Sequence, residues 1–521
     1  MHSFSRLNNP LACLLLLSLA FSAAGFAQPP PPPNAFTQYL AECEKPTTEF
    51  FGVFLANQKV GYMSSSCHFV DKAKTQLRLE THMVLRVVLG GKEVSREVLQ
   101  TDVYEAKPKG KLLKSKVLMK GDGGEQSLSA EKKGAGFEVK RERPGMPADT
   151  FSPGEISQTL EDANLPFLSF LEKKPLQGKQ WDWTQFKNHH IQTQLGKTQM
   201  RFAGGLQSLM QEVVQTSSEN NLNASYWFDE TAKLREVELA PGMRAVLEPE
   251  EIAKRLDKVD LFNLVRVVLP RALPREALQA PSVVHYTFKG FPKELALASA
   301  RQQWGPLKNG LQTLRVEAAP PRNTQPLFPL ADPEGGKNLQ ATTQIESKLP
   351  AVLTLAKKIV GKEKNAWAAA QKINRWVFQN VKKGYGVSAD TTQQILKQME
   401  GDCTEHSLLA TSLLRSLGIP ARRINGLVYA PQMGDATPAL YWHQWTEVFV
   451  GSWVEMDPTF NEEVASAGRI ALGRELETHI VQGFGQMDVV EVRYEKGGEG
   501  EGVAPPPLPP SPPLSPPPPP P

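Results

Sequence analysis

Three residues in the last quarter of the chain have side chains that could act together on a carbonyl group. Cys403 stands just before an apolar run with helical periodicity, His443 lies in the strand-like stretch 441–450, and Asp457 follows fourteen residues later. A cysteine at a helix start, with a histidine and an aspartate on successive strands, is the arrangement of a thiol nucleophile with its base and orienting acid.

Each of these residues also has a purely structural interpretation. A lone cysteine is usually a small buried hydrophobe, and a histidine between tryptophans can be a core residue. Asp457 precedes Pro458, and Asp-Pro commonly begins a turn. The combination of Cys403, His443 and Asp457 favours the chemical interpretation over all three alternatives.

The helix that must position the thiol is marked at both ends. Asp402 is a good N-cap and Glu405 stands three residues later, which is a capping-box arrangement that makes Cys403 the first helical residue. Gly418 is expected to end the helix as a left-handed cap, and Pro420 prevents its resumption. The buried face is expected to consist of leucines at 408, 409, 413, 414 and 417.

At the helix start the thiol should meet unpaired N–H groups and the positive end of the helix dipole. Both favour the thiolate, which is the nucleophilic form. The negative charge of Asp402 opposes this effect, so a histidine partner is needed to form a stable ion pair.

Whether His443 and Asp457 can meet depends on the turn between their strands. A two-residue turn at Gly451 and Ser452 would place His443 and Asp457 on opposite faces of the sheet. A three-residue loop, residues 450–452, would pair Phe449 with Trp453 and place them on the same face. We therefore predict an odd-length loop or a bulge.

The chain resembles the bacterial transglutaminase-like superfamily, a branch of papain-like thiol enzymes, over roughly residues 345–480. The segments that carry the resemblance follow the family's order: 401–406 (Gly-Asp-Cys-Thr-Glu-His), 417–422 (Leu-Gly-Ile-Pro-Ala-Arg), 426–429 (Gly-Leu-Val-Tyr), 443–448 (His-Gln-Trp-Thr-Glu-Val) and 453–459, with the upstream helix 366–380. The resemblance implies an α+β fold, in which helices pack on an antiparallel sheet.

The resemblance also implies roles for individual residues. Cys403 would be the nucleophile, His443 the general base and acid, and Asp457 the orienting carboxylate in acyl transfer or hydrolysis at an amide through a thioester. The N–H of Cys403 is expected to be one oxyanion donor. Tyr385 and Trp376 are candidates for a second donor, and the alternative that they are ordinary core aromatics is at least as well supported. Glu405 is assigned to capping, and the adjacent His406 is a weaker alternative partner for the thiol.

The amino-terminal residues indicate export. An apolar run at 11–24 followed by Gly-Phe-Ala is typical of a signal peptide cleaved after Ala27, although retention as an anchor is an alternative. Cleavage leaves three cysteines, of which Cys43 and Cys67 can pair in an oxidising compartment and leave Cys403 free. The expected location is the periplasm or the extracellular side of a bacterial cell envelope, with no stable membrane span after cleavage.

Composition shifts and the family resemblance together divide the chain into six parts. These are a signal peptide (1–27), a proline-rich spacer (28–35), a mostly antiparallel β-rich domain (36–290), a connector (291–345), the catalytic domain (346–495) and a proline-rich disordered tail (496–521). Alternating apolar residues over 77–87 followed by Gly90 and Gly91 predict one hairpin of the β domain, and residues 226–239 predict another.

Other function classes have little support. The formal charge of +4 without a basic, aromatic-rich stripe argues against nucleic-acid binding. No cofactor motif is present, and we interpret His189 and His190 as a solvated pair because metal-ligand companions are missing nearby. The expected partner is a protein or peptide substrate, with the cell envelope as a candidate source. A non-catalytic peptide-binding or scaffold protein of the envelope is the alternative, and the sequence indicates neither the acyl acceptor nor the oligomeric state.

Overall fold

The computed structural model describes residues 35–496 apart from positions 46, 122–123, 135, 145–146, 153–155, 173–179, 185–187, 204–205, 218–221, 241, 280, 323–325, 343, 386–388, 390, 432–436, 476–482 and 484. The expected signal peptide, almost all of the spacer and almost all of the tail lie outside these residues. The side chains of His189 and His190 also lie outside the described part of the chain.

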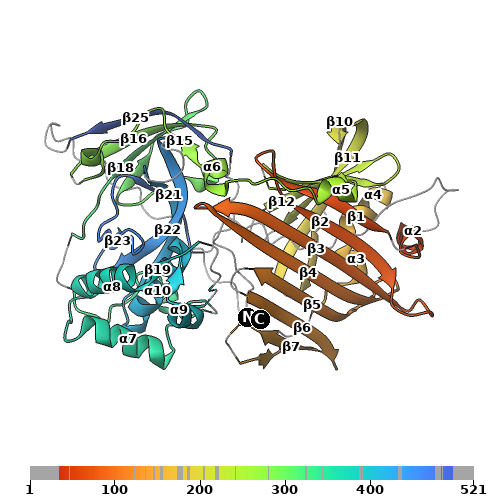
Figure 1. Ribbon diagram of the computed structural model, residues 1–521, viewed down its shortest axis with the longest axis horizontal. Helices are drawn as coiled ribbons and strands as arrows, with labels where there is room; N and C mark the ends of the chain where they lie inside the picture. The colour runs from red at the N-terminus through yellow and green to blue at the C-terminus, as the bar shows by residue number, and fades with distance from the viewer. Residues whose placement is uncertain are drawn as a thin grey trace, which may run out of the picture.

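The amino-terminal half folds into one antiparallel sheet of fourteen strands, which forms the right lobe in Figure 1. Its order is β8-β7-β6-β5-β4-β3-β2-β1-β14-β13-β12-β11-β10-β9. Neighbouring strands in the sheet are consecutive in the sequence, except that β1 pairs with β14. The strands are β1 (Thr48–Leu55), β2 (Gln58–Phe69), β3 (Gln76–Leu89), β4 (Lys92–Glu105), β5 (Leu112–Gly121), β6 (Gly124–Lys133), β7 (Gly136–Glu142), β8 (Asp149–Phe151), β9 (Gln180–Thr184), β10 (Asn188–Ala203), β11 (Leu206–Ser217), β12 (Leu222–Asp229), β13 (Leu234–Ala240) and β14 (Met243–Glu248).

Alternating side chains explain why these segments form half-buried strands. In β3 the apolar residues at 77, 79, 83, 85, 87 and 89 are all buried, and polar or partly exposed residues lie between most of them. Leu89 pairs with Lys92, and Gly90 and Gly91 between them both have positive φ, as a tight type I′ turn requires. Both predicted hairpins, β3–β4 and β12–β13, are confirmed.

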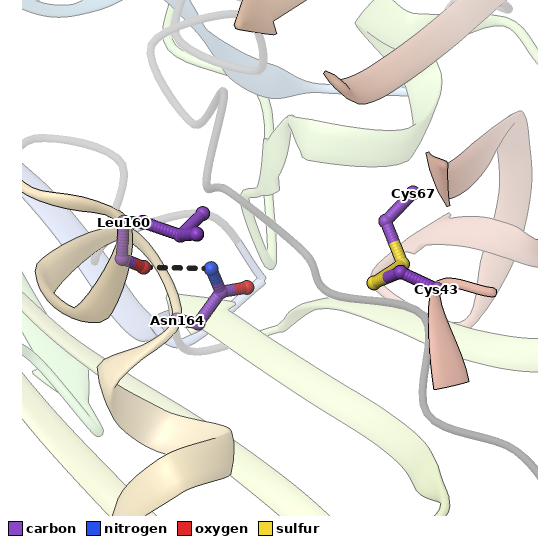
Figure 2. The surroundings of a disulfide bond; sticks show 4 residues. All are labelled: Cys43, Cys67, Leu160 and Asn164. Carbon is purple, nitrogen blue, oxygen red and sulfur yellow. Dashed lines mark hydrogen bonds between the residues drawn. A yellow bond between two sulfur atoms is a disulfide. The ribbon is translucent and has the colours of Figure 1, made fainter. Parts of the chain in front are cut away.

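Short helices and one disulfide complete this lobe. The helices α2 (Ala35–Glu42), α3 (Leu160–Ala163) and α4 (Leu165–Glu172) contribute to the same apolar core as the strands. Cys43, just after α2, is joined to Cys67 in β2, as expected, and Figure 2 shows this bond together with the hydrogen bond from Asn164 to the carbonyl of Leu160. The disulfide therefore ties the first helix to the sheet.

The second lobe begins with elements that connect the two sheets. After α5 (Glu250–Ala253) and α6 (Leu261–Val265), strand β15 (Val267–Val268) joins a sheet of order β15-β22-β21-β24, with β23 paired to β22. These strands are β21 (Ala421–Tyr429), β22 (Ala439–Phe449), β23 (Trp453–Met456) and β24 (Arg469–Arg474). A separate four-stranded sheet contains β17 (Gln302–Trp304), β18 (Leu311–Glu317), β16 (Val283–Lys289) and β25 (Asp488–Glu495).

One helix, α10 (Cys403–Ser416), packs against β21 and β22 of the first of these sheets. The helices α7 (Pro350–Val360), α8 (Ala366–Asn380) and α9 (Thr392–Gln398) pack on α10, and a parallel pair of two-residue strands, β19 (Lys382–Lys383) and β20 (Glu400–Gly401), lies beside them. The short 3-10 helices are η1 (Arg275–Leu278), η2 (Lys293–Leu295) and η3 (Lys337–Leu339). The expected α+β fold, with a large antiparallel sheet before a helix-on-sheet region, is confirmed.

The interval 291–345, predicted as a connector, contains β17 and β18 and contributes buried residues to the second lobe. Arg301 from this interval hydrogen-bonds Glu455 and the carbonyl of Arg469. The exact domain boundaries stay a prediction. Within the described residues, no helix combines the length and the apolar character that crossing a bilayer would need.

Candidate active site

Helix α10 places Cys403 in its first turn. Asp402 is the N-cap: its Oδ1 accepts the N–H of Thr404 at 2.8 Å, and the Glu405 carboxylate accepts the N–H of Asp402 at 2.8 Å. The capping box is therefore present as predicted, and Gly418 has the expected positive φ of 77° just beyond the helix. The cap takes up the N–H groups of Thr404 and Glu405, and the N–H of Cys403 stays the predicted oxyanion donor.

The hairpin of β22 and β23 has the three-residue loop that the register argument demands. Phe449 pairs with Trp453, and residues 450–452 form the loop, so the predicted odd-length turn is confirmed. Side chains two residues apart in a strand share a face, and this register brings His443 and Asp457 together. The distance from His443 Nε2 to Asp457 Oδ2 is 2.8 Å.

Asp457 is held as a carboxylate by several donors. Its Oδ1 accepts the N–H groups of Thr459 and Phe460, at 2.8 and 3.2 Å, while Oδ2 also accepts Arg469 Nε at 2.8 Å. Burial alone would raise the pKa of Asp457, but the positive charges of His443 and Arg469 outweigh burial and hold the pKa well below its usual range. Sequence reasoning missed Arg469, because nothing in the spacing of β24 shows which strand it will face.

The thiol lies against β22. The backbone N–H of Gln444, the residue after His443, is near enough to the sulfur to lower the pKa of the thiol in part, which places the thiol beside the histidine strand. Burial raises the pKa of the Cys403 thiol well above its usual range, and the charge of Asp402 adds to this. The expected preference for thiolate from the helix terminus is therefore not the dominant effect, because loss of solvent and a neighbouring carboxylate outweigh the donors.

The tautomer of His443 follows from its partner. Because Nε2 lies against a carboxylate oxygen, Nε2 carries the proton and Nδ1 is the nitrogen with a free lone pair. The ring is stacked over Trp445, with centroids 6.0 Å apart, and Phe460 packs edge-on at 5.2 Å. Trp445 is in turn fixed by a 2.8 Å hydrogen bond from its indole to Glu455.

The remaining candidates occupy different environments. His406 Nδ1 hydrogen-bonds the carbonyl of Asp402 at 2.7 Å, its Nε2 has no partner among the described residues, and burial lowers its pKa. Trp376 packs against the apolar core beneath the helices. Burial and then the charges of Cys403 and Asp402 raise the pKa of the Tyr385 hydroxyl, so this hydroxyl is within electrostatic reach of the thiol. The oxyanion roles of Tyr385 and Trp376 stay predictions.

Within the described residues, no group of three or more His, Cys, Asp or Glu side chains could hold a metal ion. The site consists of a cysteine, an imidazole and a carboxylate fixed by an arginine.

Residues 353–458, which include Cys403, His443 and Asp457, match the transglutaminase-like superfamily, so this part of the chain is a transglutaminase-like domain. No curated protein matches the chain.

Solved structures are similar to parts of it. A candidate cysteine protease from Cytophaga hutchinsonii shares 16% identity over 43% of this chain and 91% of its own, with a TM-score of 0.29. The periplasmic domain of TgpA from Pseudomonas aeruginosa shares 18% identity over 38% of this chain and 89% of its own, with a TM-score of 0.23. A β-barrel-like protein of a domain of unknown function from Brucella abortus shares 12% identity over 39% of this chain and 95% of its own, with a TM-score of 0.29. Scores this low carry no argument about function.

Proposed function

We propose that this chain is an exported thiol enzyme that cleaves or transfers the acyl group of an amide through a thioester on Cys403. The observation that carries the proposal is the 2.8 Å contact between His443 Nε2 and Asp457 Oδ2, on the strand whose next N–H reaches the Cys403 sulfur. The disulfide between Cys43 and Cys67 supports an oxidising compartment outside the cytoplasm.

The chemistry follows from the positions of the protons. His443 Nδ1 removes the thiol proton as the Cys403 sulfur attacks the substrate carbonyl, and Asp457 stabilises the imidazolium that forms. The imidazolium then gives its proton to the departing amine, and the carbon–nitrogen bond breaks to leave a thioester. Water or a second amine, deprotonated by His443, resolves the thioester and restores the thiol.

The proposed substrate is a glutamine side chain or a peptide bond of a cell-envelope protein. Both are amides that this sequence of steps can cleave. With water as acceptor the products are a carboxylate and an amine, whereas an amine acceptor gives a new amide. A glutamine peptide offered with and without a fluorescent amine separates the two outcomes, because ammonia release without incorporation of the amine would rule out amine transfer.

Alkylation of Cys403 tests the reactive pair without knowledge of the substrate. We expect iodoacetamide at about pH 6 to modify Cys403 rapidly in the native protein, because transfer of the proton to His443 supplies a thiolate below the usual thiol pKa. The His443→Ala variant should lose this reaction. His406→Gln is the matched control, since it removes the neighbouring imidazole but leaves the contact between His443 and Asp457.

Mass spectrometry of the peptide that contains Cys403 measures alkylation of this residue separately from that of the other cysteines. Equal, slow labelling of the native protein and the His443→Ala variant would overturn the proposal and favour a non-catalytic envelope binding or scaffold protein. Loss of labelling only in His406→Gln would make His406 the partner of the thiol and overturn the assignment to His443. Circular dichroism on each variant checks that the fold is retained.

A further inference from the structure

The backbone places Tyr385 beside the nucleophile. Strands β19 and β20 run parallel, with Lys383 paired to Gly401, and the N–H of Gly384 continues the pairing by donating to the carbonyl of Gly401 at 3.1 Å. Tyr385 directly follows Gly384, and Cys403 follows Gly401 by two residues as the first residue of α10, so this pairing brings Tyr385 near the amino end of that helix. Burial and then the charges of Cys403 and Asp402 raise the pKa of the Tyr385 hydroxyl, which agrees with a position near the thiol.

The ring of Tyr385 is held by residues from outside the transglutaminase-like domain. A Cβ atom built on Gly90, at the tip of the β3–β4 hairpin, would lie 2.5 Å from Cε2 of Tyr385. The Phe262 ring of α6 packs edge-on against the same ring, with centroids 5.2 Å apart. Lys92, two residues past the hairpin tip, donates to the carbonyl of Tyr385 at 3.4 Å.

The hairpin and α6 are themselves connected to the strand that carries His443. The N–H of Val88 in β3 donates to the carbonyl of Val259 at 2.7 Å, just before α6. At the other end of α6, the indole of Trp442 donates to the carbonyl of Val265 at 2.8 Å. Figure 1 shows α6 between the two lobes, next to the end of β3. These contacts make a continuous wall from the amino-terminal sheet to β22.

We propose that the tip of the β3–β4 hairpin is part of the active-site wall: Gly90 and Phe262 position the Tyr385 ring beside Cys403, and the amino-terminal sheet thereby controls which groups reach the thiol. The control of substrate access rests on the proposed function of Cys403, whereas the positioning of the Tyr385 ring does not. Tyr385 is a positioning residue, and Gly90 acts through it. The amino-terminal sheet would then restrict the size of the acyl group on the side of the thiol that Tyr385 occupies.

Two adjacent glycines offer a matched test. Gly90 and Gly91 both have positive φ, 55° and 81°, so alanine meets backbone strain at each. They differ in their surroundings, because a Cβ on Gly91 has nothing within 4 Å, whereas a Cβ on Gly90 must displace the Tyr385 ring. Comparison of Gly90→Ala with Gly91→Ala therefore separates ring displacement from general strain on the hairpin.

The measurement compares alkylation of Cys403 by small iodoacetamide and by a bulky fluorescein maleimide. We expect Gly90→Ala to change the ratio of the two rates about 10- to 100-fold, the size of effect that a displacement of about 1 Å has in active sites. Gly91→Ala should leave the ratio unchanged. In a Tyr385→Ala background, Gly90→Ala should have no further effect, because the ring it displaces is gone.

The inference is overturned if both glycine variants change the ratio equally, or if the effect of Gly90→Ala persists in the Tyr385→Ala background. If Gly90→Ala does not fold, Phe262→Leu perturbs the same ring from its other side and replaces it in the cycle. Access of reagents to the sulfur does not require His443. Failure of this test is therefore distinguishable from failure of the proposed function, which the His443→Ala variant examines.

Discussion

Replacement of Asp457 by asparagine should separate the chemical role of the carboxylate from its structural role. Asp457 is fully buried and Arg469 has 3% of its side chain exposed, with Arg469 Nη2 2.7 Å from Asp457 Oδ2. Asp457→Asn leaves the guanidinium without its buried partner, which costs about 3–5 kcal/mol of unfolding free energy when a buried pair is broken. Glu462 remains 2.7 Å from Arg469 Nη1, so we expect the lower end of this range.

The reactivity of the thiol should fall by a separate mechanism. Loss of the charge-assisted hydrogen bond between His443 and Asp457, worth about 1.5–3 kcal/mol, should reduce the thiolate–imidazolium population by about 10- to 100-fold. Iodoacetamide labelling of Cys403 at about pH 6 measures this loss. Glu462→Gln is the matched control, because it removes the other carboxylate from Arg469 without touching His443.

Glu462 is about one-third exposed, so its replacement should cost only about 1 kcal/mol and leave labelling at the native rate. Unfolding by denaturant gives the stability of each variant. Native labelling rates in Asp457→Asn, at a pH where the variant is folded, would refute the assignment of Asp457. The sign of the pH dependence gives a second check. Asp457 has a lowered pKa, so its contribution to stability is present above about pH 4 and lost on acidification, and the variant should lack this loss.

Three further predictions concern stability. Burial and then the charge of Glu49 raise the pKa of Glu42 to about 8. The native protein should therefore lose stability as the pH rises from about 4.5 to 8, by at most about 1.4 kcal/mol per pH unit because water screens the carboxyl in part. Unfolding of Glu42→Gln measured across that range should lack this slope. Joint replacement of Cys43 and Cys67, 24 residues apart, by alanine should cost about 3.5 kcal/mol in the chain-entropy description, and an unchanged melting temperature would contradict it. Arg301→Met should cost about 3–5 kcal/mol of unfolding free energy, because the ion pair with Glu455 that it breaks is buried. The double variant Arg301→Met with Glu455→Gln removes the unpaired carboxylate and should recover much of this stability in denaturant unfolding.

The local geometry of the site could be predicted from the sequence because the signals are local. The capping residues Asp402 and Glu405 and the terminal Gly418 mark a helix that the structure places at Cys403–Ser416. The length of the 450–452 loop followed from a parity requirement, because strand side chains alternate and His443 can meet Asp457 in only one of the two parities.

The support behind the site could not be predicted in the same way. Arg469 and Arg301 lie on segments whose own patterns are unremarkable, and their roles depend on which buried carboxylates the fold brings within reach. Tyr385 is a similar case, since its ring contacts Gly90 and Phe262, far earlier in the chain. Periodicity reports which face of an element is buried, but not which distant element covers it.

Two opposing influences act on the ionisation of Cys403 in the proposed mechanism: its surroundings favour the thiol, and the histidine–aspartate pair favours the thiolate. Burial and the carboxylate of Asp402 raise the pKa of the thiol, so the helix terminus alone does not produce a thiolate. The ionised state requires a proton acceptor whose own charge is stabilised, and Asp457 provides this for His443 because Arg469 keeps it ionised. In the proposed mechanism a reactive thiol therefore depends on the whole network: the helix positions the sulfur, and the β22–β23 hairpin supplies the histidine and aspartate that would let it ionise.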